Sequence, residues 1–180
     1  MHPSRRRLAA SWTLPEPPYT RAHGPRRALF LGSRQAAQQL NLHGPETNRT
    51  VITASLIEKE VSVDSERPLV AGVFVNRLAK DIPLATDPTV IYAALLEDRW
   101  RGTIYASDLK NPSPYNTYIH TGLPPGPIAN PGMAAFRAAL SPAQTDYLYF
   151  VSDAAGHSRF SATLKEHNQN VESYRKAEQH

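Results

Sequence analysis

The sequence predicts an α+β fold, a helix-rich domain that carries one small antiparallel β-sheet. Apolar residues recur at helical spacing in several segments between residues 46 and 140, which indicates amphipathic helices. Near the C-terminus, DYLYFVS, DAAGHS and RFSA follow one another as a strand, a turn and a second strand. Helices followed by a single hairpin, without alternating strands and helices, are typical of the α+β class. The length of 180 residues suits one domain with an appendage.

The first 45 residues differ from the rest and are predicted to form a basic, proline-rich leader that is poorly ordered or a degraded remnant. They hold seven arginines, no lysine and one acidic residue, Glu16. Residues 46–180 hold 13 basic and 15 acidic side chains, so the net charge of +4 comes from the leader. A solvated arm explains this composition, and no nucleic-acid partner is expected. The alternative, nucleic-acid binding through the leader, predicts steep salt dependence.

Several helices of the expected domain start at a recognisable signal. Asp64 or Ser65 is expected to cap the second helix, and Asp87 followed by Pro88 opens the third, because proline suits the first helical position. The last helix is polar and is expected on the surface. The expected helices cover residues 46–61, 66–80, 88–98, 131–140 and 163–179.

A long loop region is expected between residues 99 and 129, and ordered loops of this length are often functional. It contains Tyr115, Asn116 and Tyr118 in the run SPYNTY. Aromatic rings can stack on sugar faces and amides can bind hydroxyls, so these residues suit sugar recognition. The same residues are as common in plain turns, and both interpretations stay open.

The run SLIEKEVS at residues 55–62 contains the strongest candidate for chemistry. On a helix, Glu60 lies within about 80° of Ile52, Leu56 and Val63, so it continues an apolar stripe. Loss of hydration favours the neutral form of a carboxyl and raises its pKa. Glu60 could then donate a proton near neutral pH, as a general acid must.

Each acidic candidate also has an interpretation without chemistry. Glu58 and Glu60 could both pair with Lys59 or Arg67 at the end of the helix. Asp87 is first a helix cap and second a catalytic carboxylate. No metal site or cofactor is expected, because the chain has no cysteine, no His-x-x-x-His spacing and no glycine-rich phosphate loop.

Three runs in the chain resemble, in the same order, the endolytic murein transglycosylase family, also called YceG-like. They are TASLIEKEVSVDSERPLVAGVFVNRLAKDIPLATDPTVIYA, SDLKNPSPYNTYIHTGLPPGPIANPG and DYLYFVSD. The resemblance spans roughly residues 46–175 and identifies residues 46–180 as a YceG-like catalytic domain. The first of these runs includes Glu60, the residue that the apolar stripe also favours.

The resemblance implies an enzyme that cuts nascent peptidoglycan strands between N-acetylmuramic acid and N-acetylglucosamine and leaves 1,6-anhydro ends. Glu60, the second glutamate of the Glu-x-Glu pair, would be the single general acid and base. The expected partners are glycan strands and cell-wall synthases, at the periplasmic face of the bacterial inner membrane. The residues expected to bind the sugar beside it are Glu58, Asp87, Tyr115, Asn116 and Tyr118.

The family's N-terminal membrane anchor and LysM-like domain are not recognisable in the sequence, so membrane contact is expected only through an anchor that the chain lacks. This motivates an alternative, a truncated and inactive relic that binds glycan without cutting it. A second alternative is the aminodeoxychorismate lyase label that YceG-like chains have carried. It requires a pyridoxal phosphate Schiff-base lysine, for which Lys59 between two acids is a poor candidate.

Overall fold

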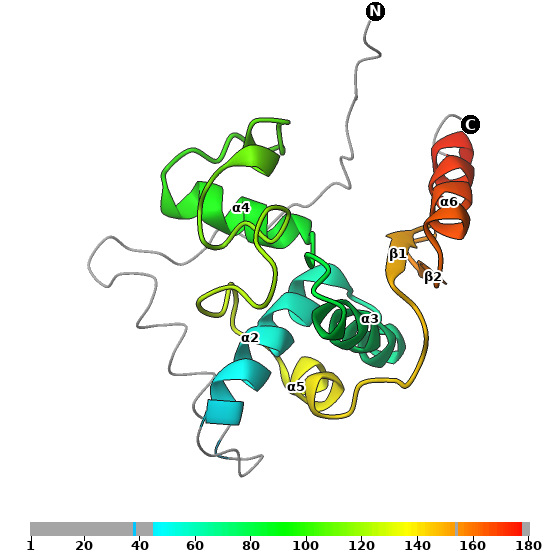
Figure 1. Ribbon diagram of the computed structural model, residues 1–180, viewed down its shortest axis with the longest axis horizontal. Helices are drawn as coiled ribbons and strands as arrows, with labels where there is room; N and C mark the ends of the chain where they lie inside the picture. The colour runs from blue at the N-terminus through cyan, green and yellow to red at the C-terminus, as the bar shows by residue number, and fades with distance from the viewer. Residues whose placement is uncertain (1–37, 39–44, 154, 178–180) are drawn as a thin grey trace, which may run out of the picture.

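The structure is a computed structural model that describes residues 38, 45–153 and 155–177, and it confirms the predicted α+β fold (Figure 1). The leader predicted at residues 1–45 lies outside the described residues, apart from Gln38 and Pro45. The elements in chain order are α2 (Pro45–Glu60), the 3-10 turn η1 (Asp64–Glu66), α3 (Arg67–Ala79), α4 (Asp87–Leu96), the 3-10 turn η2 (Asp108–Lys110), α5 (Met133–Leu140), β1 (Tyr149–Ser152), β2 (Ser158–Ser161) and α6 (Leu164–Ala177).

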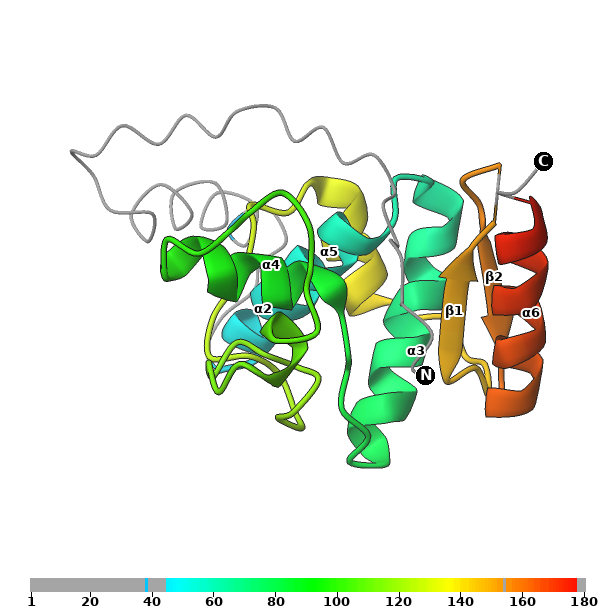
Figure 2. The ribbon, with the colours of Figure 1, turned by 90° about the horizontal axis from the view of Figure 1, so that it is seen from above.

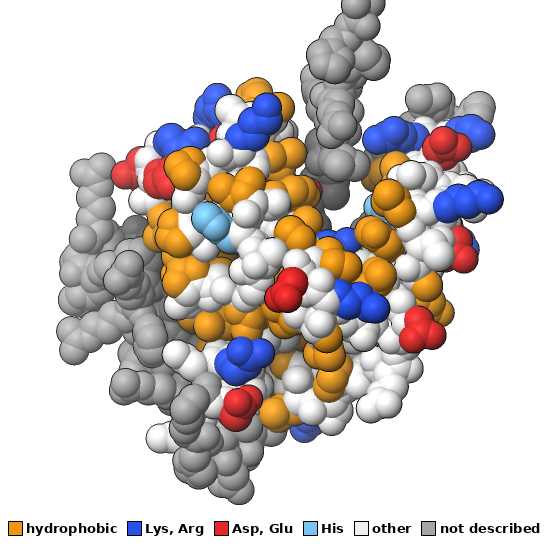
Figure 3. Space-filling view, in the orientation of Figure 1, with side chains coloured by type: hydrophobic (Ala, Val, Ile, Leu, Met, Phe, Trp, Pro, Cys, Tyr) orange, Lys and Arg blue, Asp and Glu red, His pale blue; other side chains and the backbone are white. Residues whose placement is uncertain are grey.

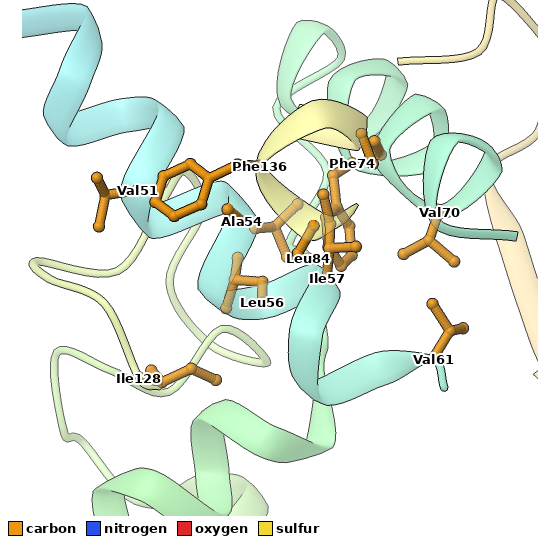
Figure 4. Packing of buried hydrophobic residues seen from close by; sticks show 13 residues of the cluster. Val51, Ala54, Leu56, Ile57, Val61, Val70, Phe74, Leu84, Ile128 and Phe136 are labelled. Atoms are coloured by element: carbon orange, nitrogen blue, oxygen red, sulfur yellow. The ribbon is translucent and has the colours of Figure 1, made fainter. Parts of the chain in front are cut away.

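The hydrophobic core lies where α2, α3 and α5 pack against one another (Figure 4). Leu56 of α2, Phe74 of α3 and Phe136 of α5 are buried almost completely. Leu84, in the loop between α3 and α4, and Ile128, in the loop between η2 and α5, belong to the same cluster. Burying a side chain of this size contributes about 1.5–3 kcal/mol. The core therefore fixes the C-terminal half of α2, where the candidate glutamate lies.

Two helices start differently from the caps expected from the sequence. The turn η1 precedes α3, and Glu66 takes the N-cap position that was expected at Asp64 or Ser65. Thr86 is the N-cap of α4, and Asp87 is the first helical residue. Neither N-cap makes a side-chain hydrogen bond to its helix. The carboxylate of Asp87 is thus not the helix cap that its position before a proline suggested.

An irregular strap, residues 141–148, leads from α5 along α3 to the sheet. The Asn76 amide on α3 donates to the carbonyls of Thr145 (2.7 Å) and Tyr147 (3.0 Å). A Cβ at Gly72 would lie 2.4 Å from the Ala143 carbonyl oxygen, so only glycine allows this approach. The strap is therefore held closely against α3.

Strands β1 and β2 form the predicted hairpin, which stands between α3 and α6 (Figure 2). Tyr149 pairs with Ser161 and Ser152 pairs with Ser158 in antiparallel register. Phe150 packs edge-on against Phe74, with 6.4 Å between ring centroids, and so attaches the hairpin to α3. Helix α6 has no buried residue, as expected for a polar surface helix.

The surface of the described domain mixes charges of both signs. Basic and acidic side chains are interspersed on the face shown in Figure 3, with hydrophobic side chains between them. Within the described ranges, no helix combines the length and the apolar character that a membrane crossing requires.

Candidate active site

Four polar side chains from four separate segments converge at the end of α2. They are Glu60, the last residue of α2; Arg77 in the last turn of α3; Asp87 at the start of α4; and Tyr118 from the loop between η2 and α5. Each of the four interacts electrostatically with at least two of the others. We call these four residues the Glu60 cluster. The structure thus brings together three of the residues predicted from the sequence and adds an arginine.

Glu60 behaves as the stripe argument predicts. Burial raises its pKa from 4.5 to about 8, the negative charge of Asp87 adds to the rise, and the positive charge of Arg77 opposes it. The residue keeps some exposed surface, but protein atoms surround the carboxyl closely enough for burial to dominate its pKa. Glu60 is therefore mostly protonated at neutral pH, and no hydrogen bond to another described residue occupies its carboxyl.

Asp87 is held by a tyrosine on the neighbouring loop. The Tyr118 hydroxyl donates a hydrogen bond of 2.5 Å to Oδ1 of Asp87. Burial, and then the charge of Asp87 and this hydrogen bond, raise the pKa of Tyr118, so the phenol keeps its proton as a donor. The bond fixes the Asp87 carboxylate beside Glu60.

Asn116 organises the loop that carries Tyr118. Its side chain has no exposed surface. Its amide nitrogen donates to the carbonyls of Leu109 (3.1 Å) and Asn111 (2.8 Å), and its amide oxygen accepts from the Tyr118 backbone N–H (3.0 Å). The geometry therefore supports a positioning role for Asn116 in place of the direct sugar contact expected from the sequence.

Three buried threonines attach the same loop to the start of α4. The Thr117 hydroxyl oxygen accepts from the backbone N–H of Thr86 (3.1 Å) and lies 2.9 Å from the Thr89 hydroxyl. The Thr117 carbonyl accepts from the backbone N–H of Ala85 at 2.8 Å. Buried polar groups that are all paired in this way make a rigid link. The link sets the distance between Tyr118 and Asp87.

Glu58 and Tyr115 lie outside the Glu60 cluster. Oε2 of Glu58 accepts from Arg67 Nη1 (3.2 Å) and from the backbone N–H of Gly132 (3.0 Å), so Glu58 ties α2 to α3 and to the start of α5. The pairing with Arg67 that was open for both glutamates is thus found for Glu58. Tyr115 packs edge-on against Tyr92, with 4.9 Å between ring centroids. Sugar contacts by Glu58 and Tyr115 stay predictions.

Arg77 is the residue of the cluster that sequence reasoning missed. Its Nε donates to the carbonyl of Leu148 (2.6 Å), and Nη1 donates to those of Pro83 (2.9 Å) and Leu84 (3.0 Å). Helical spacing, the signal used for Glu60, could have identified Arg77 as well. Arg77 continues the helical stripe of the buried Val70 and Phe74.

The arrangement can transfer a proton in both directions. A neutral carboxyl donates near pH 7, and a fixed cation close by stabilises the carboxylate that remains. Glu60 supplies the first group and Arg77 the second, while the Asp87–Tyr118 pair adds a fixed negative charge.

Comparisons with known proteins agree on one family of sequences. The sequence model of the YceG-like family matches residues 23–173. The Bacillus subtilis protein named endolytic murein transglycosylase is 50% identical over 127 residues, which cover 71% of this chain and 34% of that protein. A Streptococcus pneumoniae serotype 2 protein of the same name is 36% identical over 133 residues, which cover 69% of this chain and 23% of that protein.

A solved structure extends the similarity to the fold. The 2.6 Å crystal structure of a YceG-like protein from Listeria monocytogenes matches with a TM-score of 0.64 and 42% identity. The match covers 76% of this chain and 43% of that one. This chain spans about a third of the length of the Bacillus relative and about a quarter of the Streptococcus relative.

Proposed function

Because this chain belongs to the YceG-like family, we propose that it is a lytic transglycosylase that cuts peptidoglycan strands internally. It would cleave between N-acetylmuramic acid and N-acetylglucosamine and leave a 1,6-anhydro end. The observation that carries the proposal is the carboxyl of Glu60, whose pKa of about 8 makes it a proton donor at neutral pH. The names of the curated relatives support the substrate class.

Glu60 performs both proton transfers in this mechanism. Its protonated carboxyl donates to the glycosidic oxygen as the bond from that oxygen to C1 of the muramyl residue breaks. The C6 hydroxyl of the same sugar then attacks C1, and its proton returns to the Glu60 carboxylate. The ring closes without water, so the second carboxylate that activates water in an inverting glycosidase is not needed. Proximity of the C6 hydroxyl replaces it.

Asp87 and Tyr118 stabilise the charge that develops on the sugar. Breaking the glycosidic bond gives C1 the character of an oxocarbenium ion, which is positive. The Asp87 carboxylate, fixed by the Tyr118 hydroxyl, is a preorganised negative group near Glu60. Asn116 acts indirectly, by holding the loop that carries Tyr118.

The substrate sets the place of action. Nascent strands are made at the periplasmic face of the bacterial inner membrane, and the chain would work there beside cell-wall synthases. This location is therefore inferred from the proposed substrate.

The test is digestion of uncrosslinked peptidoglycan strands by the purified chain and by Glu60→Gln, with products identified by mass spectrometry. Glu46→Gln, an exposed glutamate at the start of the same helix, is the matched control. We expect anhydro-muramyl ends from the wild type and the control, and none from Glu60→Gln. Reducing ends would indicate hydrolysis, with Asp87 as the first candidate for the base. A folded wild type that releases nothing would favour the glycan-binding relic.

A further inference from the structure

The Arg77 side chain is a half-buried cation without a salt bridge to a carboxylate in the part of the chain that the structure describes. Its three hydrogen-bond acceptors there, the carbonyls of Leu148, Pro83 and Leu84, are all neutral. Withdrawing part of a guanidinium from water is costly where no carboxylate pairs with it, and this partial burial lowers the pKa of Arg77.

The acceptors of Arg77 belong to two segments that border the Glu60 cluster. Pro83 and Leu84 lie just before Asp87 in the chain, and Leu148 is the residue before β1. A single planar group therefore fixes the entry to α4 against the entry to the hairpin. A lysine could not reproduce this, because it lacks the fork of donors in fixed directions.

The charge of Arg77 also acts on Glu60. The groups that face Glu60 from the elements around it are Arg77 on α3, Asp87 on α4 and Tyr118 on the loop. Burial and Asp87 disfavour the Glu60 carboxylate, and Arg77 is the group that favours it. A residue that donates a proton and takes it back needs both forms within reach of neutral pH.

The far side of Arg77 is closed by aromatic rings of the hairpin layer. Its guanidinium carbon lies 5.1 Å from the centroid of the Tyr149 ring, and this ring stacks on His167 of α6 at 5.2 Å. Burial, and then the charge of Arg77, lower the pKa of His167, so the histidine stays neutral near pH 7 and adds no second cation. Arg77 is thus the cation that the cluster presents to Glu60.

We propose that Arg77 is a positioning residue of the transglycosylase reaction, which orients Asp87 through the segment before it and supplies the positive charge that lets Glu60 release its proton. This inference rests on the proposed function. It predicts two separable effects, one of geometry and one of charge.

The experiment compares Arg77→Lys and Arg77→Met in the full chain with the matched control Asn76→Ala. Asn76 precedes Arg77 on α3 and holds the same strap, but it does not contact the segment before Asp87. Two quantities are measured: the pKa of Glu60, from the pH dependence of its carboxyl ¹³C signal, and kcat and KM for strand cleavage against pH. The carboxyl signal is assigned by its loss in Glu60→Gln.

We expect Arg77→Met to raise the pKa of Glu60 by about one pH unit or more, because the opposing charge is gone. Arg77→Lys should keep this pKa close to that of the wild type and lower kcat about tenfold or more, with little change in KM, because the charge remains and the geometry is lost. Asn76→Ala should change neither the pKa nor kcat.

Several outcomes would overturn the inference. One is an unchanged pKa of Glu60 in folded Arg77→Met, and another is a wild-type kcat in Arg77→Lys. Should Arg77→Met not fold, the kcat of Arg77→Lys decides. Equal losses in Arg77→Lys and Asn76→Ala would reduce Arg77 to a structural support of the strap. A folded wild type that cleaves nothing would refute the proposed function itself, whatever the carboxyl signal shows.

Discussion

Replacing Glu60 by glutamine removes a carboxyl that the folded protein keeps protonated at neutral pH. The size of the side chain stays almost unchanged. Its pKa is 4.5 in the unfolded chain and about 8 in the fold. Between these values the folded chain holds a proton that the unfolded chain has released, so stability is lost as the pH rises from 4.5 to about 8. At about 1.36 kcal/mol per pH unit the loss reaches about 5 kcal/mol. This is an upper bound, because the exposed part of Glu60 lets water share the charge.

The assay is urea unfolding of the wild type and Glu60→Gln from about pH 5 to about pH 9. Subtracting the two free energies of unfolding at each pH cancels the titration of every group that the two proteins share. We expect the glutamine variant to gain stability relative to the wild type as the pH rises, and to level off above about pH 8. A difference that stays constant over this range would refute the raised pKa. The proton-donor role of Glu60 at neutral pH would then lose its basis.

Three further substitutions test how the fold supports the site. Gly72→Ala places a Cβ 2.4 Å from the Ala143 carbonyl oxygen and should lower the free energy of unfolding by about 1–3 kcal/mol; an unchanged urea midpoint would mean that the strap yields freely. Thr117→Val leaves the buried N–H of Thr86 without its acceptor and should cost about 1–3 kcal/mol by the same assay, whereas a neutral effect would show that the link can rearrange. Although burial raises the pKa of Glu66, hydrogen bonds from the hairpin lower it overall, so the stability lost in Glu66→Gln should be largest above about pH 4.5 and shrink in acid; a loss that is the same at both ends of a pH series of thermal melts would contradict this.

The secondary structure could be predicted because its signals are local. The helix expected at residues 66–80 is found as α3, Arg67–Ala79, and the expected strand pair is found as β1 and β2. Periodicity and prolines decide such elements within a few residues of chain. The N-cap predicted at Asp87 was wrong. A proline marks the start of a helix but does not decide which neighbouring residue is the N-cap.

The site could be predicted only in part, because its contacts join residues far apart in the chain. Helical spacing favoured Glu60 without deciding between the two glutamates. The structure shows Glu58 paired with Arg67, while Glu60 makes no such pair. The hydrogen bond of Arg77 with Leu148 spans 71 residues, and no local pattern encodes it. Asn116 was expected to bind sugar for its polarity, yet its burial could be seen only in the folded chain.

The Glu60 cluster explains how one carboxyl could serve as both acid and base. Burial and Asp87 alone would hold the proton on Glu60 too tightly for it to be given up, and Arg77 alone would keep the carboxyl ionised and unable to donate. Because burial and Asp87 act against Arg77, the pKa of Glu60 lies close to neutral pH, where the carboxyl can both donate its proton and take it back. A hydrolase divides this work between two carboxylates with different pKa values. In the proposed mechanism a single glutamate does this work beside a fixed cation, so the hydrogen bonds of Arg77 to three carbonyls would matter as much as its charge.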